Sequence, residues 1–291
     1  MHPMLAEPVA PPPPPAAAAA PRRPRTRPGW VTALGLRVGH WADDARLTLH
    51  FVGEVLLSLS RLLRGKARMR ASDLFFQIDQ AGPRSVAIVS LVSGLVGVIL
   101  AYMGAVQLQR FGAETYIADL VTIGAVREVA ALMTGVILSG RIGAAYAAQL
   151  GSMQANEEVD ALRALGVDPV DHLVLPRVLA LLCVAPLLTA FAALVAVAAG
   201  WLVAVAIFGV APQEYLFKSL QSLTLGHVLI GLCKGTLYCL LVALAGCRQG
   251  LNAGRSAQAV GQAVTASVVQ AIVWIVVAAS ALTIAFQRLD W

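Results

Sequence analysis

Five long apolar stretches fill most of the chain after residue 84 and limit what it can fold into. The first, Ser85–Leu108, contains no charged residue and is longer than the about 20 residues that a helix needs to cross a hydrocarbon core. The other four lie within residues 115–150, 173–210, 225–246 and 259–286. Only 13% of all residues are charged, against about 25% in soluble domains. The pattern predicts an all-α integral membrane protein with five transmembrane helices, and it argues against a soluble enzyme.

The distribution of charge predicts the orientation in the membrane. Residues 1–84 hold twelve Lys and Arg against six Asp and Glu, whereas residues 85–291 hold ten of each. Because basic residues favour the cytoplasmic side, we expect a cytoplasmic N-terminus and, after five spans, a C-terminus on the periplasmic side. Nucleic-acid binding is the other use of a basic segment. The neutral, apolar remainder offers no nucleic-acid surface, so we expect no nucleic-acid partner.

The first 84 residues divide into a tail and a helical region. Residues 1–35, rich in Pro, Ala and Arg, predict a disordered tail. Residues 36–84 predict an amphipathic helix over Trp41–Arg64 and a basic connector, because apolar and polar side chains recur there at spacings of three and four. The predicted polar stripe of this helix consists of Asp43, Arg46, His50, Glu54, Ser58 and Arg61. Such a helix packs on a soluble domain or lies in the membrane interface. No soluble domain is evident, so we favour the cytoplasmic interface, ahead of a transmembrane domain over 85–291.

The segment between the second and third spans is acidic although we place it in the cytoplasm. Residues 152–166 predict a short helix with an apolar edge that includes Leu162, ended by Gly166. One interpretation is a solvated loop helix. The other is a docking helix that fits a cytoplasmic partner, and its polar residues are Glu157, Glu158, Asp160 and Arg163.

A series of ordered motifs gives the chain a specific resemblance. They are G-A-E-T at Gly112–Thr115, R-E at Arg127–Glu128, S-G-R-I-G-A-A at Ser139–Ala145, Q-L-G-S-M at Gln149–Met153, E-x-x-D-A-L-R-A-L-G-V-D-P at Glu157–Pro169 and L-P-R at Leu175–Arg177. In this order and spacing the chain resembles the MlaE/YrbE-type permeases of ABC transporters. The similarity extends, less sharply, from Ser85 to about Phe286, and the first 35 residues lie outside it.

The resemblance implies a function that the residues alone do not. Such a permease would form a homodimer in the bacterial inner membrane and bind a cytoplasmic ABC ATPase subunit and a periplasmic MCE-domain lipid-binding protein. It would move lipids, phospholipid above all, between the membrane and that carrier. The implied cytoplasmic coupling helix would cover about residues 152–166, with Glu157, Glu158, Asp160, Leu162 and Arg163 as the coupling residues.

Two adjacent charges, Arg127 and Glu128, lie well inside the second apolar stretch. An unpaired charge there costs at least about 2.5 kcal/mol, so each needs a partner from another helix or a water-filled cavity. They form structural ion pairs, or they line a lipid cavity or contact the MCE partner; the resemblance favours the second hypothesis. Lys234 and His227 in the fourth span look isolated, and we expect structural roles for them. We expect Arg141 near the cytoplasmic end of its span.

Small residues recur along the end of the second apolar stretch. Gly140, Ala144 and Ala148 are four residues apart and lie beside Gly143. Small residues at this spacing let helices approach closely. The contact is either packing within one subunit or the seam of a dimer, and the sequence leaves both open. The four cysteines lie in or beside apolar stretches and read as packed small residues.

Catalytic and cofactor motifs are missing from the sequence. It has no G-x-x-x-x-G-K-[ST] phosphate loop, so ATP and Mg²⁺ would be bound by the partner ATPase. We expect no catalytic residues, no metal site and no cofactor in this chain. The alternative class is a self-contained secondary transporter of a hydrophobic solute. It predicts inverted repeats with interrupted helices, of which we find no convincing example.

Overall fold

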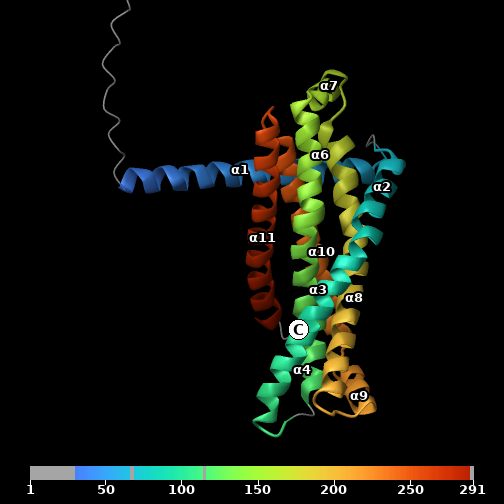
Figure 1. Ribbon diagram of the computed structural model, residues 1–291. Coiled ribbons are helices and arrows are strands. Elements are labelled where there is room, and N and C mark those ends of the chain that lie inside the picture. The colour runs from blue at the N-terminus through green and yellow to red at the C-terminus, as the bar shows by residue number, and fades with distance from the viewer. Residues whose placement is uncertain (1–29, 66–68, 114–115, 289–291) are drawn as a thin grey trace, which may run out of the picture. The chain divides into compact units, whose positions relative to one another are not determined.

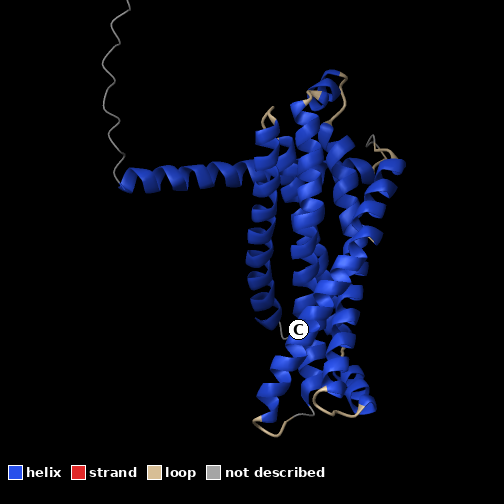
Figure 2. Ribbon diagram, in the orientation of Figure 1, coloured by secondary structure: helices blue, strands red, loops and turns tan. Residues whose placement is uncertain are grey.

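The computed structural model describes residues 30–65, 69–113 and 116–288, and these residues are helical apart from short connections (Figure 2). Five helical segments are long and apolar enough to cross a membrane. They are Ala71–Gln109, Ile117–Ala155, Val170–Ala206, Leu225–Leu251 and Ala257–Arg288. The predicted all-α fold with five membrane-spanning helices is therefore confirmed.

The N-terminal helix α1, Trp30–Leu63, begins eleven residues before the predicted start at Trp41. Residues 1–29 of the predicted tail lie outside the described residues, and residues 30–35 are helical. The chain divides into two units, 1–46 and 47–291, and the description below concerns the second. The part of α1 from Leu47 onward crosses the spans instead of running along them (Figure 1).

Two faces of this part of α1 differ in burial. Phe51, Val55 and Ser58 are buried against the bundle, although Ser58 belongs to the stripe that the sequence predicts to be polar. Leu49 and Leu56 are exposed. A helix that packs one face on a bundle while leaving a leucine face open suits an interface between lipid and water.

The first span begins at Ala71, whereas the apolar stretch in the sequence suggested a start at Ser85. It consists of α2, Ala71–Ala81, and α3, Pro83–Gln109. Gly82 separates the two helices, and Pro83 stands at the first position of α3, where its missing N–H costs nothing. Helix α2 is amphipathic and carries Asp73 and Asp79, which is why the apolar pattern alone did not include it.

The second span is interrupted twice by π-helical turns. Its α-helical parts are α4, Ile117–Gly124, α5, Ala130–Leu138, and α6, Ala144–Ala155. The turns are η2, Ala125–Val129, and η3, Ser139–Gly143. A π-helical turn inserts an extra residue into an α-helix and is frequent at functional sites. Each of these two turns carries an arginine.

The remaining helices complete the bundle. Helix α7, Glu158–Ala164, is followed by the π-turn η4, Val170–Val174, and by α8, Leu175–Ala206. Helix α9, Pro212–Ser222, connects α8 to α10, Leu225–Leu251, and α11, Ala257–Arg288, follows. Helices α7 and α9 lie at opposite ends of the spans (Figure 1).

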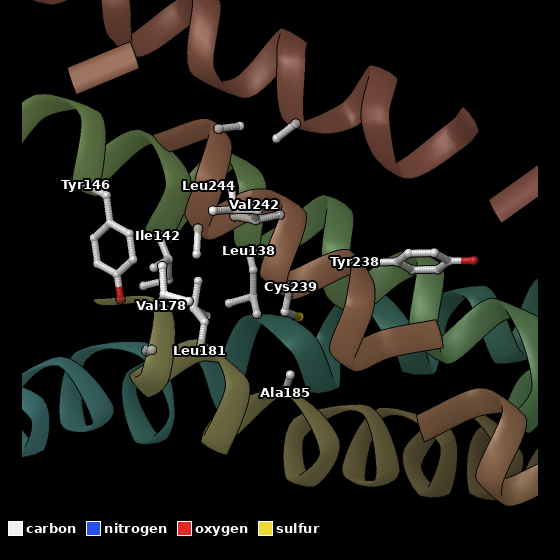
Figure 3. Packing of buried hydrophobic residues seen from close by; sticks show 14 of the residues in the cluster. Leu138, Ile142, Tyr146, Val178, Leu181, Ala185, Tyr238, Cys239, Val242 and Leu244 are labelled. Carbon is white, nitrogen blue, oxygen red and sulfur yellow. The ribbon is translucent and has the colours of Figure 1, made fainter. Parts of the chain in front are cut away.

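The core is built from aliphatic side chains with a tyrosine toward each end, Tyr146 and Tyr238 (Figure 3). Helices also meet directly at glycines. A Cβ atom added to Gly231 of α10 would lie 2.1 Å from the carbonyl oxygen of Val126, and one on Gly97 of α3 would lie 2.2 Å from that of Ala196. Such contacts leave no room for a side chain, so one crossing fixes the spacing of α10 and η2, and the other fixes the spacing of α3 and α8.

Candidate functional site

A lysine, a carboxylate and a hydroxyl meet inside the bundle. The ammonium of Lys234 on α10 donates to Glu128 of η2, and it donates a second hydrogen bond of 3.0 Å to Oγ1 of Thr283 on α11. The Thr283 hydroxyl also lies 3.3 Å from the second oxygen of Glu128. The ring centroid of Phe286 is 5.8 Å from the ammonium. Three spans are thus joined by one polar cluster, which we call the Glu128 cluster.

Burial differs within the Glu128 cluster. The Lys234 side chain is fully buried, whereas 37% of the Glu128 side chain is exposed. A buried ammonium needs a counter-charge, because taking it out of water costs several kcal/mol. Lys234, which looked isolated in the sequence, is therefore the partner that Glu128 requires.

Arg127 has a different neighbour. Its Nη1 lies 3.4 Å from Nδ1 of His227, near the start of α10. Adjacent residues of a helix point in different directions, and here they reach two different levels of the same partner helix. The sequence predicted that each charge needs a partner from another helix or a water-filled cavity, and both side chains contact residues of α10.

Helix α7 is shorter than the helix predicted over 152–166. Ser152–Ala155 continue α6, and Glu157 breaks the helix because its φ of 62° is left-handed. Helix α7 ends at Ala164, and Gly166, which the sequence predicted to stop the helix, follows two residues later with a left-handed φ of +71°. The Gly166 N–H donates to the carbonyl of Arg163, and the next N–H donates to that of Leu162. This pair of hydrogen bonds is typical of a helix C-terminus at which glycine is favoured.

One edge of α7 is packed on the bundle and the other is open. Val159 is fully buried, and Leu162 packs against the core. Leu165 is 76% exposed, and the Glu158 carboxylate, whose residue is exposed, accepts a hydrogen bond from Asn156. Helix α7 thus presents an acidic and apolar surface away from the spans.

Arginines outside α7 tie the acidic segment to other helices. Arg255, between α10 and α11, pairs with Glu157 at 3.2 Å and with Asp160 at 3.1 Å. Asp160 also accepts from Arg163 within α7, at 3.1 Å. These pairs connect α7, which already joins the second and third spans, to the loop between the fourth and fifth.

Arg61 forms the corresponding link from α1. Its guanidinium lies 2.9 Å from Asp168 and 3.0 Å from Asp171, at the start of the third span. The acidic segment between the second and third spans conflicted with the usual charge rule for cytoplasmic segments. Several of its carboxylates therefore pair with arginines of the same chain. Sequence reasoning missed Arg61 and Arg255, because nothing along the chain pairs them with residues about 100 positions away.

The predicted small residues separate into two rows. Gly143 packs within the chain: a Cβ there would lie 3.1 Å from Val242 of α10, and one on Gly246 would lie 2.7 Å from the Gly143 carbonyl oxygen. Gly140 has open space around it and is exposed, while Ala144 and Ala148 are half-buried. One row makes intramolecular contacts and the other leaves room for a close neighbour.

Two arginines stabilise the end of the bundle near α7. Arg141 of η3 donates a 2.6 Å hydrogen bond to Ser85 of α3. Arg177 of α8 is buried, donates 3.2 Å to Gln149, and lies over the Tyr146 ring at 5.7 Å. These contacts join the first three spans at this end. Arg141 lies in the half of its span that leads to α7, and its place near the cytoplasmic end stays a prediction.

Five spans, polar residues buried between them and an acidic helix outside them define an integral membrane protein of the transporter type. The chain belongs to the family described as Permease MlaE, which matches residues 74–285. The family predicted from the ordered motifs is thereby confirmed. Of those motifs, Glu114 and Thr115 lie outside the described residues.

Curated relatives carry names that agree with this family. The chain is 32% identical over 233 residues to a protein of Synechocystis sp. named Probable ABC transporter permease protein, covering 80% of this chain and 86% of that protein. A protein of Rickettsia typhi with the same description is 33% identical over 67% of this chain and 76% of its own. The chloroplastic protein TRIGALACTOSYLDIACYLGLYCEROL 1 of Arabidopsis thaliana is 30% identical, and the match covers 78% of this chain and 63% of that protein. The chain is therefore a permease subunit rather than a catalytic one.

Proposed function

We propose that this permease subunit moves phospholipid between the bacterial inner membrane and a periplasmic MCE-type carrier, driven by a separate cytoplasmic ATPase. Its N-terminus is cytoplasmic and its C-terminus periplasmic, so α7 faces the ATPase and α9 the carrier. Support for a lipid as cargo comes from the family and from the Arabidopsis relative, which is named after a glycolipid. ATP and Mg²⁺ are bound by the partner.

The observation that carries the mechanism is the way α7 is attached. Helix α7 is continuous with the second and third spans through short connections and is paired with Arg255 of the loop between the fourth and fifth. A rigid displacement of α7 by a docked ATPase therefore reaches four spans. The docking residues are Glu157, Glu158, Asp160, Leu162 and Arg163, of which Glu157, Glu158 and Arg163 are exposed.

Glu128 and Arg127 form the polar lining of the transport path or the contact with the carrier. The Glu128 cluster joins the second, fourth and fifth spans. When these spans move apart, the side chains of the cluster lose their contacts with one another and contact a lipid headgroup instead. The α1 helix lies in the cytoplasmic interface, with its exposed leucines in the lipid.

The open small-residue row supports the homodimer. Gly140, Ala144 and Ala148 form a surface on which a second copy can pack closely, whereas Gly143 is already in contact within the chain. Two copies would enclose the transport path between them and bind one ATPase subunit each.

Charge reversal at Glu158 tests the coupling role. Glu158→Lys should weaken co-purification of the ATPase at least several-fold while the chain still inserts and folds, because Glu158 makes its contact within the loop and not with another span. Glu157→Lys is less suitable, since it also breaks the pair with Arg255. The matched control is Glu214→Lys on α9 at the opposite end. Unchanged ATPase co-purification and activity for Glu158→Lys would contradict the docking role.

A further inference from the structure

The corner between α7 and the third span is built around Asp168. One oxygen of its carboxylate accepts a 2.9 Å hydrogen bond from the Val170 N–H, and its backbone carbonyl accepts one of 3.1 Å from the His172 N–H. Pro169 has a φ of −60°, which its ring fixes. Asp168 and Pro169 therefore set the direction in which the chain leaves the loop after α7 and enters η4.

The other carboxylate oxygen of Asp168 pairs with α1. Nη2 of Arg61 lies 2.9 Å from this oxygen and 3.0 Å from a carboxylate oxygen of Asp171, so one guanidinium nitrogen serves two acids. Only 11% of the Asp171 side chain is exposed, and a carboxylate that is largely removed from water needs a counter-charge. Arg61 supplies it, although it lies 107 residues from Asp168 in the sequence.

Arg61 is held in place by the helix that carries it. Phe51, Val55 and Ser58 of α1 are buried against the bundle. Arg61 follows them on the same face, since residues three or four apart along a helix lie one above the other. This part of α1 crosses the spans at the end where α7 lies (Figure 1). Arg61 thus joins the corner to a helix that belongs to neither the second nor the third span.

Without Arg61 the corner would be the point at which the chain yields most easily. The carboxylates of Asp168 and Asp171 would repel each other, and η4 is a π-turn, a rare conformation that is frequent at functional sites. Hinges consist of a few residues at the ends of helices, which absorb a displacement by changing their backbone angles. A push on α7 would then bend the chain at Val170–Val174 instead of moving α8.

Both ends of α7 are tied by arginines from elsewhere in the chain. Arg255 pairs at 3.2 Å with Glu157, immediately before the helix, and Arg61 pairs with Asp168, shortly after it. The first pair leads to the loop between the fourth and fifth spans, and the second leads to α1. A displacement of α7 therefore reaches the third span undiminished only while the pair at Arg61 holds.

We infer that Arg61 is a positioning residue for transport, which holds the corner at Asp168 so that a displacement of α7 moves the third span. The inference deepens the proposed function and rests on it in taking an ATPase as the source of the displacement. The ion pairs of Arg61 involve neither the five docking residues nor the Glu128 cluster. Its loss should therefore leave ATPase binding intact and break the link between ATP hydrolysis and lipid transfer.

The amount of ATP hydrolysed per lipid transferred tests this role. Proteoliposomes that contain the chain, its ATPase subunit and a fluorescent phospholipid are mixed with a soluble MCE-type acceptor. Arg61→Gln should hydrolyse ATP at no less than half the wild-type rate, while lipid transfer falls at least five-fold. The ATPase should co-purify with Arg61→Gln as it does with the wild type, in contrast to Glu158→Lys.

Three further variants separate the charge at the corner from other effects. Arg61→Lys should restore at least half of the transfer, because one nitrogen of Arg61 serves both acids and an ammonium can take its place. Asp168→Asn keeps an acceptor for the Val170 N–H and leaves Arg61 with Asp171, so it should fold even where Arg61→Gln does not, and raise the ATP used per lipid at least two-fold. Arg64→Gln removes the same charge at an exposed position three residues later; it is the matched control and should change neither rate.

Three results would overturn the positioning role. Hydrolysis and transfer that fall in equal proportion in Arg61→Gln would indicate lost docking or lost folding instead. Two unchanged rates in this variant would show that the corner does not need Arg61. An Arg61→Lys variant that transfers lipid no better than Arg61→Gln would contradict the part assigned to the charge.

Amide hydrogen exchange tests the corner without the ATPase. In the purified chain in detergent, Arg61→Gln should make exchange at Val170–Val174 at least five-fold faster and leave the middle of α3 unchanged. Unchanged exchange at the corner would overturn the inference. If the wild-type complex shows no ATP-dependent transfer, the proposed function fails, and the exchange measurement alone decides whether Arg61 holds the corner.

Discussion

Removing Glu128 should destabilise the chain mainly by stranding the charge of Lys234. The Lys234 side chain is fully buried, and Glu128 is the acid that it contacts. Breaking a buried ion pair by removing one partner costs about 3–5 kcal/mol in soluble proteins. The hydrogen bond to Thr283 and the Phe286 ring remain with the ammonium, so we expect about 2–3 kcal/mol for Glu128→Ala.

Removing both charges should cost less than the two separate changes together. In Glu128→Ala/Lys234→Met no buried charge is left without a partner, and apolar replacement of a buried pair is often close to neutral. We therefore expect the double variant to lose less unfolding free energy than the two single variants lose together, by at least about 1.5 kcal/mol. The coupling is the quantity that the geometry predicts, because it does not depend on how each helix tolerates the substitution alone.

The assay is SDS-induced unfolding in mixed micelles, followed by circular dichroism. Thr236→Val is the control on α10, since the Thr236 hydroxyl donates only to the carbonyl of Leu232 within the same helix. It should shift stability little and show no coupling to Glu128→Ala. Additive effects of Glu128→Ala and Lys234→Met, within about 0.5 kcal/mol, would refute the claim that the two groups form a buried pair.

Three further perturbations follow from the packing of α10 and α7. Gly231→Leu should destabilise the chain by about 3 kcal/mol or more, because its Cβ would lie 2.1 Å from a carbonyl oxygen of η2; Gly261→Ala, which has open space, should unfold like the wild type. Arg255→Ala should cost no more than about 1 kcal/mol of unfolding free energy, since its ion pairs with Glu157 and Asp160 are exposed. Amide hydrogen exchange should nevertheless become faster in α7 and not in α3, and unchanged exchange in α7 would contradict the view that Arg255 holds this helix in place. Gly166→Ala should cost about 1–2 kcal/mol of unfolding free energy because the φ of Gly166 is +71°, and Gly166→Asn should cost less. Proteolysis of the loop after α7 would measure both losses, and equal losses in the two variants would argue against left-handed backbone strain.

The parts of the fold that were predicted are those that leave a local trace in the sequence. A stretch such as Ser85–Leu108 identifies a span by length and lack of charge, and Gly166 identifies a helix end because that turn requires a positive φ. The family followed from motifs in a fixed order. Each of these signals is carried by neighbouring residues, so no tertiary information was needed.

The parts that were missed depend on contacts between distant segments. Lys234 looked isolated because its partner lies in another span, 106 residues away. Ser58 was assigned to a polar stripe, but α1 buries it against the bundle. The π-turns of the second span are also invisible to periodicity, since one inserted residue hardly alters an apolar pattern. The opposite charges of Glu128 and Lys234, both in apolar stretches, were the one available sign that they pair.

The most direct test of the central claim is ATP-dependent lipid transfer by the reconstituted complex. Proteoliposomes containing this chain and its ATPase subunit would hold a fluorescent phospholipid, and transfer to a soluble MCE-type acceptor would be followed with ATP, with a non-hydrolysable analogue and without the ATPase. We predict transfer only when both ATP and the ATPase are present, either from the proteoliposomes to the acceptor or from a loaded acceptor to the proteoliposomes. This transfer should be lost in Glu158→Lys. Transfer of equal rate without the ATPase would instead indicate a self-contained transporter, and the absence of any ATP-dependent transfer would contradict the account.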